Sequence, residues 1–332
     1  MRFFPILAVI AGITAMVALV WRLGAAAVLH SLIAIGPFGF ASVCLIHTAL
    51  IALMGLAWWA LLPGTRPWAA IWGRFVRDAG SEVLPLSQVG GYVLGTRALA
   101  LAGVPGTRGA ASTIVDVTLE FVGQLVYVGL GLVWLLHLHT EGIAPGLVVL
   151  GLAGASVLAV AFIVVQRRGV RYAERIAGIL GQGWAERTAA GAAALHNALE
   201  AIYRRRGGLW SSFLLHFLCW VLSASEIWAA LAFAGQPIPF GSALIIESLV
   251  YAMRTAAFVV PNAVGIQEGA YILLGGAFGL NPEMALALSL LKRARDLTIG
   301  LPVLAWWQVV EGGRLSRRLS AKRATPPLPT RD

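Results

Sequence analysis

The stretch RTAAFVVPNAVGIQEGAYILLGG (Arg254–Gly276) lies in a long apolar region but contains an arginine, a proline, an asparagine, a glutamine and a glutamate. Polar groups without water partners are costly in hydrocarbon. Pro261 lacks a backbone donor, and Gly265 and Gly269 tolerate backbone angles that other residues avoid. The stretch therefore predicts a membrane helix that opens at Pro261; a kinked span with interfacial polar residues is the alternative. The polar side chains beside the opening are Asn262, Gln267 and Glu268.

The rest of the chain has the composition of an integral membrane protein. Of its 332 residues, 59% are hydrophobic and only 12% are charged, and the mean hydropathy is +0.81. Soluble domains carry about 25% charged residues. The apolar residues come in runs of about twenty, the length that crosses a bilayer. We predict an all-α, polytopic membrane helix bundle with about six full spans. These are Phe3–Trp21, Phe38–Leu62, Ala110–His137, Leu147–Gln166, Leu209–Ala234 and Met284–Val310.

Positive charge is concentrated between the spans and predicts the topology. The net charge is +10, and Lys and Arg accumulate in cytoplasmic loops. The segment TRPWAAIWGRFVRD and both termini are therefore expected on the cytoplasmic side. Residues 167–208 predict an amphipathic helix on the membrane surface. We expect a transmembrane domain over 1–312 and a basic, disordered tail over 313–332. This distribution favours contact with anionic lipid head groups over nucleic acid.

A second broken segment occurs earlier, in SEVLPLSQVGGYVLGTRALALAG (Ser81–Gly103). Irregular backbone at membrane depth is tolerated where it is buried in protein or lines a wet cavity, so we predict a re-entrant hairpin. Pro85 precedes Pro261 by 176 residues, and the same offset relates Glu120 to Asp296. The two hairpins are expected to enter from opposite sides, as in the inverted repeats of secondary transporters. Chance likeness between apolar segments is the alternative.

Ionisable residues inside membrane spans are functional candidates because their placement costs several kcal/mol. The predicted transport site comprises Glu82, Pro85, Gln88, Gly90, Gly91, Arg97, Asp116, Glu120, Arg254, Pro261, Asn262, Gly265, Gln267, Glu268, Gly269, Arg293, Arg295 and Asp296. Glu247 and Lys292 are further charged residues in apolar segments. The run KRARD has a second reading as a loop at the membrane edge. Glu226 lies in the middle of a span and is interpreted as pairing with a neighbour, whereas His47 and His216 are interpreted as packing residues.

Sequence motifs for catalysis are missing from the chain. There is no P-loop, GxSxG, HExxH or redox motif, and the two cysteines are isolated, so they form neither a disulfide framework nor a metal site. We therefore expect no enzyme activity, no cofactor and no metal.

Three segments carry a resemblance to a known family: LPLSQVGGYVLGTRALALAG, ASTIVDVTLEFVG and VVPNAVGIQEGAYILLGGAFGLNPEMALALSLLKRARDLTIGLP. They resemble the transmembrane regions of lysylphosphatidylglycerol synthases, a flippase-like family, over roughly residues 5–312. Within it the chain looks most like the HpnL-type proteins associated with hopanoid biosynthesis. The most specific run is Pro261, Gly265, Glu268 and Gly269. Many relatives carry an acidic residue after the paired glycines, where this chain has Tyr92.

The resemblance implies a protein of the bacterial inner (plasma) membrane that moves lipids between leaflets. Two-domain relatives add a soluble aminoacyl transferase; because this chain stops at Asp332, we do not expect the synthase activity. The leading hypothesis is a lipid transporter with hopanoid-type lipid or phospholipid as its partner. An accessory protein that docks lipid-biosynthesis enzymes through the basic segment is the first alternative. An intramembrane lipid-modifying enzyme is the second.

Overall fold

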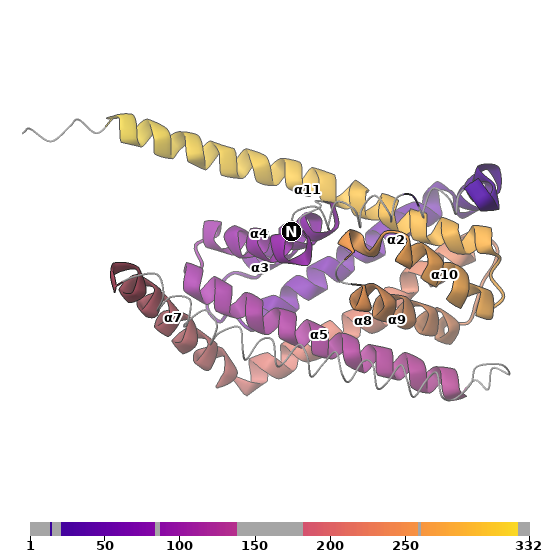
Figure 1. Cartoon of the computed structure of the whole chain (residues 1–332), viewed down its shortest axis with the longest axis horizontal. Coiled ribbons are helices and arrows are strands. Elements are labelled where there is room, and N and C mark those ends of the chain that lie inside the picture. The colour runs from indigo at the N-terminus through magenta and orange to yellow at the C-terminus, as the bar shows by residue number, and fades with distance from the viewer. Residues whose placement is uncertain (1–13, 15–20, 84–86, 138–181, 258–259, 325–332) are drawn as a thin grey trace, which may run out of the picture.

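The computed structural model describes every residue except 1–13, 15–20, 84–86, 138–181, 258–259 and 325–332 (Figure 1). The described residues form a bundle of helices without a strand, which confirms the all-α prediction. In chain order these elements are α2 (Ala25–Ala60), α3 (Pro67–Val83), α4 (Ser87–Leu101), α5 (Gly106–His137), α7 (Gln182–Tyr203), α8 (Arg206–Phe233), α9 (Phe240–Ala256), the short 3₁₀ turn η1 (Pro261–Ala263), α10 (Ile266–Ala277) and α11 (Pro282–Ala324).

The long helices support a membrane protein. Among the described helices, α2, α5 and α8 are long and apolar enough to cross a bilayer, and they cover three of the predicted spans. Leu147–Gln166 and most of Phe3–Trp21 lie outside the described residues. The fold is therefore a helical membrane bundle, and the number of six spans stays a prediction.

Helix α2 begins earlier than expected. The segment 22–37 lies between the predicted spans Phe3–Trp21 and Phe38–Leu62, but the chain is helical from Ala25. Gly36 interrupts this helix with φ 69° and ψ 175°, a conformation that glycine adopts without steric penalty. Pro37 follows and cannot supply the backbone donor of a continuous helix. The second piece of α2 therefore corresponds to the predicted span Phe38–Leu62.

Helices α3 and α4 form the first hairpin, and their close packing depends on small residues. A Cβ atom at Gly91 would collide with the Ser81 side chain and with the carbonyl oxygen of Arg77, and one at Gly95 would lie 2.8 Å from the Arg77 Cβ. Gly90 and Gly91 belong to the segment that was predicted to be broken, but both lie within the helix α4. Small residues instead allow the two helices to approach.

The second hairpin is interrupted where the sequence predicts it. Helix α9 ends at Ala256 and α10 begins at Ile266. Between them Asn262 has φ 52° and Ala263 has φ 46°, left-handed values that cost an L-residue about 1–2 kcal/mol. Gly265 has φ 84° and precedes α10. The opening thus involves strained backbone, whereas the predicted Gly269 lies inside α10.

Helix α11 is one continuous element beside both hairpins (Figure 1). It includes the run KRARD and Pro302, so the reading of KRARD as a loop was wrong. It also continues to Ala324, so residues 313–324 of the tail are helical rather than disordered; residues 325–332 lie outside the described residues. The apolar side chains of α7 pack onto the bundle through Leu195, Leu199 and Ile202.

The main apolar core lies among α2, α8, α9, α10 and α11. Its large buried side chains include Trp220, Tyr271 and Met284. A second core joins the end of α2 to α4, α5 and α7 around Trp58 and Leu99. The hairpins are thereby held against the long helices, which brings charged side chains from separate elements together.

Candidate functional site

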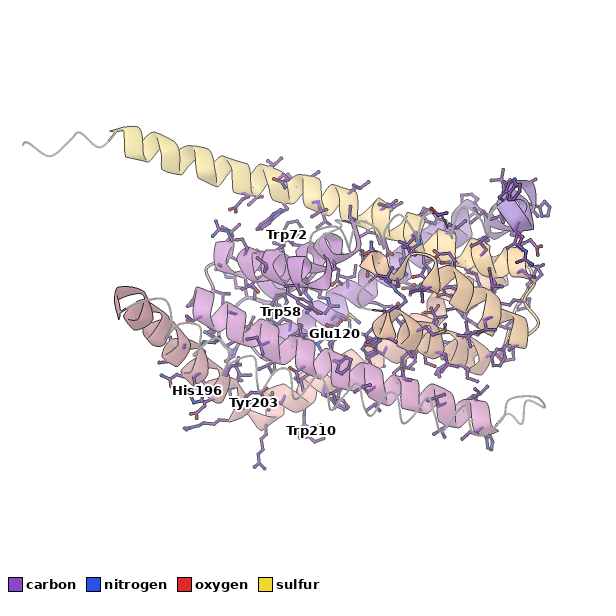
Figure 2. The ribbon with its side chains drawn as sticks, viewed as in Figure 1. Trp58, Trp72, Glu120, His196, Tyr203 and Trp210 are labelled. Atoms are coloured by element: carbon purple, nitrogen blue, oxygen red, sulfur yellow. The ribbon has the colours of Figure 1, made fainter. Side chains whose placement is uncertain are left out.

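A first group of charged side chains fills the space between α3, α5 and α8. This α3–α5 cluster comprises Arg74, Arg77, Asp78, Asp116, Glu120 and His216. Arg74 forms a two-point ion pair with Glu120, with Nη2–Oε1 at 2.7 Å and Nη1–Oε2 at 2.9 Å. Arg77 lies 2.6 Å from Asp116 Oδ2 and also contacts Glu120. Figure 2 shows Glu120 in the interior of the bundle.

Helical spacing creates this arrangement. Arg74 and Arg77 are three residues apart on α3, while Asp116 and Glu120 are four apart on α5, so each pair occupies one helix face. On the third side, His216 Nε2 lies 2.9 Å from Asp116 Oδ1. The side chain of Asp116 is fully buried. A buried carboxylate of this kind is tolerated only with charged or hydrogen-bonding partners.

A second group of charges lies between α2, α8, α9 and α11. This α8–α11 cluster comprises His47, Glu226, Glu247, Lys292, Arg295 and Asp296. Lys292 Nζ lies 2.7 Å from Glu247 Oε2 and 3.4 Å from Glu226 Oε2. Arg295 contacts Glu226 and lies 2.6 Å from Asp296 Oδ1. Lys292 and Arg295 are three residues apart and share one face of α11.

Two further contacts complete the α8–α11 cluster. His47 Nδ1 lies 2.8 Å from Glu226 Oε1, and its Nε2 lies 3.7 Å from Asp296 Oδ1. The hydroxyl of Tyr271 donates a hydrogen bond to Glu247. All six charged or titratable groups therefore have partners, and four different helices contribute them.

A third group joins the two hairpins. This hairpin-tip site comprises Glu82, Arg254, Asn262, Gly265, Gln267, Glu268, Ser289 and Arg293. The Asn262 amide donates to the backbone carbonyl of Glu82, and Arg254 Nη2 lies 3.1 Å from Glu82 Oε2. The end of α3, in the first hairpin, thus contacts the break of the second hairpin.

Glu268 organises the second break. Its Oε2 accepts a hydrogen bond from the Gly265 backbone N–H at 2.7 Å, which caps the start of α10. Its Oε1 lies 2.6 Å from Arg293 Nε and 3.1 Å from Ser289 Oγ. Glu268 is fully buried, whereas the side chains of Arg254, Arg293 and Glu82 are 15%, 20% and 25% exposed. The partly exposed charges are therefore accessible to a polar ligand, while the buried Glu268 caps the start of α10.

The structure separates the predicted site into three groups. Asp116 and Glu120 lie in the α3–α5 cluster, and Arg295 and Asp296 lie in the α8–α11 cluster. The predicted residues at the hairpin tips are Glu82, Arg254, Asn262, Gly265, Gln267, Glu268 and Arg293. No ion pair joins the three groups among the described residues.

Seven predicted site residues are not members of the three groups, among them Gly90 and Gly91 within α4 and Gly269 within α10. Arg97 pairs with Glu311 of α11, at 2.7 Å, away from all three groups. Pro85 lies outside the described residues, as does the side chain of Gln88. The backbone of Pro261 begins the short 3₁₀ turn between α9 and α10.

Several charged residues were missed by the sequence reasoning. Arg74 and Arg77 were interpreted as a cytoplasmic topology signal, although the structure buries both. His47 and His216 were interpreted as packing residues, but each lies in a charged cluster. Glu226 was expected to pair with a neighbour, and it contacts His47, Lys292 and Arg295. The available signal was the isolation of each one in an apolar span. Its partner lies on another helix, so the spacing within one segment could not reveal the pair.

An apolar groove lies away from these charges. It has a volume of about 660 Å³ and separates α11 from α3 and α4. Buried Ala98 and Trp307 line its floor, while Trp68 and Trp306 are largely exposed at its rim. Because its lining is apolar, we assign the polar chemistry to the clusters and the hairpin tips rather than to this groove. No group of three or more His, Cys, Asp or Glu in the described part of the chain has metal-binding geometry.

These features define a class of protein: a polytopic helical membrane protein with ion pairs in its interior and two interrupted hairpins. The chain belongs to the family described as the lysylphosphatidylglycerol synthase TM region, whose model matches residues 6–303. That match covers all three groups of charges. The comparisons with curated proteins and with solved structures gave no match. The family supports a membrane protein in lipid-related synthesis or transport.

Proposed function

We propose that this protein is a lipid transporter that moves an amphiphilic lipid between the two leaflets of the membrane. The head group passes the hairpin-tip site while the apolar tails remain in lipid. The observation that carries the proposal is the contact between the two hairpins, where Asn262 and Arg254 of one hairpin reach Glu82 of the other. Membership of a lipid-related membrane family supports it.

The polar groups at the tips suit a lipid head group. Arg254 and Arg293 present guanidinium groups that are only partly covered, and such groups bind phosphate or carboxylate with two hydrogen bonds. Glu82 and the Asn262 amide add an acceptor and a donor nearby. Left-handed backbone at Asn262 and Ala263 agrees with the tendency of strained conformations to occur at functional sites.

An inverted repeat is part of this proposal, and the element order supports it. The series α2–α3–α4–α5 and α8–α9–α10–α11 each contain a long helix, a 17-residue helix, a shorter helix and a final long helix. Gly106 starts α5 and Pro282 starts α11, an offset of 176 residues that also relates Pro85 to Pro261. In Figure 1 α5 and α11 run in opposite directions. Inverted repeats of this kind place transporter sites at their interface.

Hopanoid-type lipid is the favoured cargo, because the segments around both breaks resemble HpnL-type proteins. We place the protein in the bacterial inner membrane with both termini in the cytoplasm, as the distribution of arginine indicates. Transport without chemical modification of the lipid is proposed because the sequence carries no catalytic motif.

A leaflet-resolved assay tests the proposal. Purified protein is reconstituted in vesicles with a trace of fluorescent phosphatidylglycerol, and the labelled lipid in the outer leaflet is quenched chemically. Arg293→Gln removes a charge-assisted contact worth about 1.5–3 kcal/mol, so the translocation rate should fall about 10- to 100-fold. Arg204→Gln is the matched control because this arginine, which directly follows α7, is 82% exposed.

A second variant tests the role of the acidic residues. The double substitution Glu268→Gln and Asp296→Asn should slow translocation while the protein still extracts as a folded monodisperse species. A wild-type rate in this variant would refute the site assignment. Unchanged leaflet distribution with the wild-type protein, under every gradient and with hopanoid or phospholipid probes, would refute transport and favour the accessory role.

A further inference from the structure

The two buried clusters have the same charge composition. Each contains two permanently cationic side chains, three carboxylates and one histidine. The cations are Arg74 and Arg77 in the α3–α5 cluster and Lys292 and Arg295 in the α8–α11 cluster. The carboxylates are Asp78, Asp116 and Glu120 in the first and Glu226, Glu247 and Asp296 in the second. With a neutral histidine, each cluster carries two positive against three negative charges.

Apart from the exposed contacts of Glu200 with His196 and Arg204, the other ion pairs of the described residues join one cation to one carboxylate. These balanced pairs are Arg254 with Glu82, Arg293 with Glu268, and Arg97 with Glu311. An uncompensated charge in a low-dielectric interior is costly. Histidine is the side chain that ordinarily gains or loses a proton between pH 5 and 8. Protonation of one histidine per cluster therefore balances the charge that the cations leave unpaired.

Both histidines connect the two series of helices. His47 on α2, in the first series, contacts Glu226 on α8 and Asp296 on α11, both in the second. His216 on α8, in the second series, contacts Asp116 on α5, in the first. A proton at either histidine strengthens an ion pair between the two halves. Its loss weakens the same pair.

We propose that the protein binds two protons, one at His47 and one at His216, and couples their passage to lipid movement. This inference rests on the proposed transport function. A proton from the aqueous phase forms an N–H bond with the bare ring nitrogen. It leaves to the opposite aqueous phase when that bond breaks, and no other covalent bond changes.

The geometry identifies the nitrogen that receives each proton. Nε2 of His216 donates to Asp116 and leaves Nδ1 bare; this Nδ1 is buried and has no partner. The hydroxyl oxygen of Ser212, four residues earlier on α8, is also buried without a partner. Because residues four apart share a helix face, Ser212 is placed to accept from the new N–H. For His47, Nδ1 faces Glu226 and Nε2 lies 3.7 Å from Asp296.

Other charged or titratable groups set the local field at each histidine. Around His216 these are Asp116 and Glu120 of α5, Arg74, Arg77 and Asp78 of α3, Tyr92 of α4 and Cys219 of α8. Around His47 they are Glu226 of α8, Lys292, Arg295 and Asp296 of α11, and Cys44 of α2. Glu247 and Tyr251 of α9 add to this field because both contact Lys292. Each histidine therefore faces carboxylates that can accept a hydrogen bond from its protonated ring. The cations near it are already paired with carboxylates.

Proton binding is measured directly by NMR of ¹⁵N-histidine-labelled protein in detergent, which requires no transport. His47→Gln and His216→Gln assign the two resonances, and His196→Gln is the control because this histidine is 68% exposed. The expected result is that both assigned resonances change from the neutral to the charged form within pH 5–8. Two resonances that keep one protonation state over that range would overturn the proposal.

Coupling is measured in the same vesicles with a pH difference of one unit. Each coupled proton should sustain a difference of about tenfold in labelled phosphatidylglycerol between the leaflets. His196→Gln should retain this asymmetry, whereas His47→Gln or His216→Gln, which each remove one coupled proton, should lower it about tenfold. If the wild type moves lipid with no response to the gradient, coupling is wrong. If it moves no lipid although both histidines titrate, the transport function fails and the proton sites stand.

A charge-balanced variant separates coupling from folding. His216→Gln leaves the α3–α5 cluster one positive charge short, and adding Asp78→Asn restores equal numbers of cations and carboxylates. Asp78 is the more exposed carboxylate of that cluster, at 20%. The double variant should recover thermal stability but not the about tenfold part of the lipid asymmetry that depends on His216. Recovery of that asymmetry would show that His216 has a structural role only.

Discussion

The ion pair between α3 and α5 gives a sharp prediction about stability. Arg77 is 3% exposed and contacts both Asp116 and Glu120. Arg77→Met keeps most of the apolar stem but leaves one cation against three carboxylates. Removal of one partner of a buried ion pair costs about 3–5 kcal/mol. The folding equilibrium constant should therefore fall roughly 100- to 4,000-fold.

The matched control is Arg97→Met. Arg97 pairs with Glu311, but its side chain is 42% exposed, and pairs of this exposure contribute less than about 1 kcal/mol. The free energy of unfolding is obtained by SDS titration in mixed micelles, with helicity as the signal. A cycle with Asp116→Asn should show that the double variant loses less stability than the sum of the single variants. If Arg77→Met and Arg97→Met have equal free energies of unfolding, the reasoning about the α3–α5 cluster is refuted.

Three other changes test packing, strain and a buried hydrogen bond in the same titration. Gly91→Ala should destabilise the protein by about 1–3 kcal/mol because the added Cβ would collide with α3. The control is Gly129→Ala, which should not destabilise the protein because the space around Gly129 is open. Equal effects of the two substitutions would contradict the close hairpin packing. Ala263→Gly should raise the free energy of unfolding by about 1 kcal/mol because φ is 46°, and a loss of stability would show that this residue is not strained. Trp58→Phe should cost about 1 kcal/mol because Nε1 donates to Ser112 Oγ at 3.1 Å; no change would mean that the bond contributes nothing.

The membrane fold and the second break follow from local sequence. Runs of apolar residues predict α2, α5 and α8 because crossing a bilayer requires length and hydrophobicity alone. Pro261 and Gly265 locate the interruption between α9 and α10, since the conformational effects of proline and glycine act on their own neighbours. The same rule failed for Gly90 and Gly91. A glycine also permits close helix packing, and the sequence does not state which role applies.

The charged residues show the limit of local inference more clearly. Arg74 and Arg77 follow a loop and match the positive-inside pattern, yet α3 turns them toward α5. Their burial depends on Asp116 and Glu120, about 40 positions away. His216 meets Asp116 across 100 positions, and His47 meets Glu226 across 179. Hydropathy along the chain contains no information about such contacts.

By itself the sequence therefore determined that this is a membrane protein of helices, where the second hairpin opens, and which polar side chains lie in apolar segments. Only the tertiary structure decided which charges pair, that the two hairpins meet at Glu82 and Asn262, and that each cluster contains a histidine. The physical reason is the separation along the chain of the residues that each effect involves. Hydrophobic length and backbone conformation are properties of neighbouring residues, whereas charge compensation in a low-dielectric interior depends on groups that folding brings together.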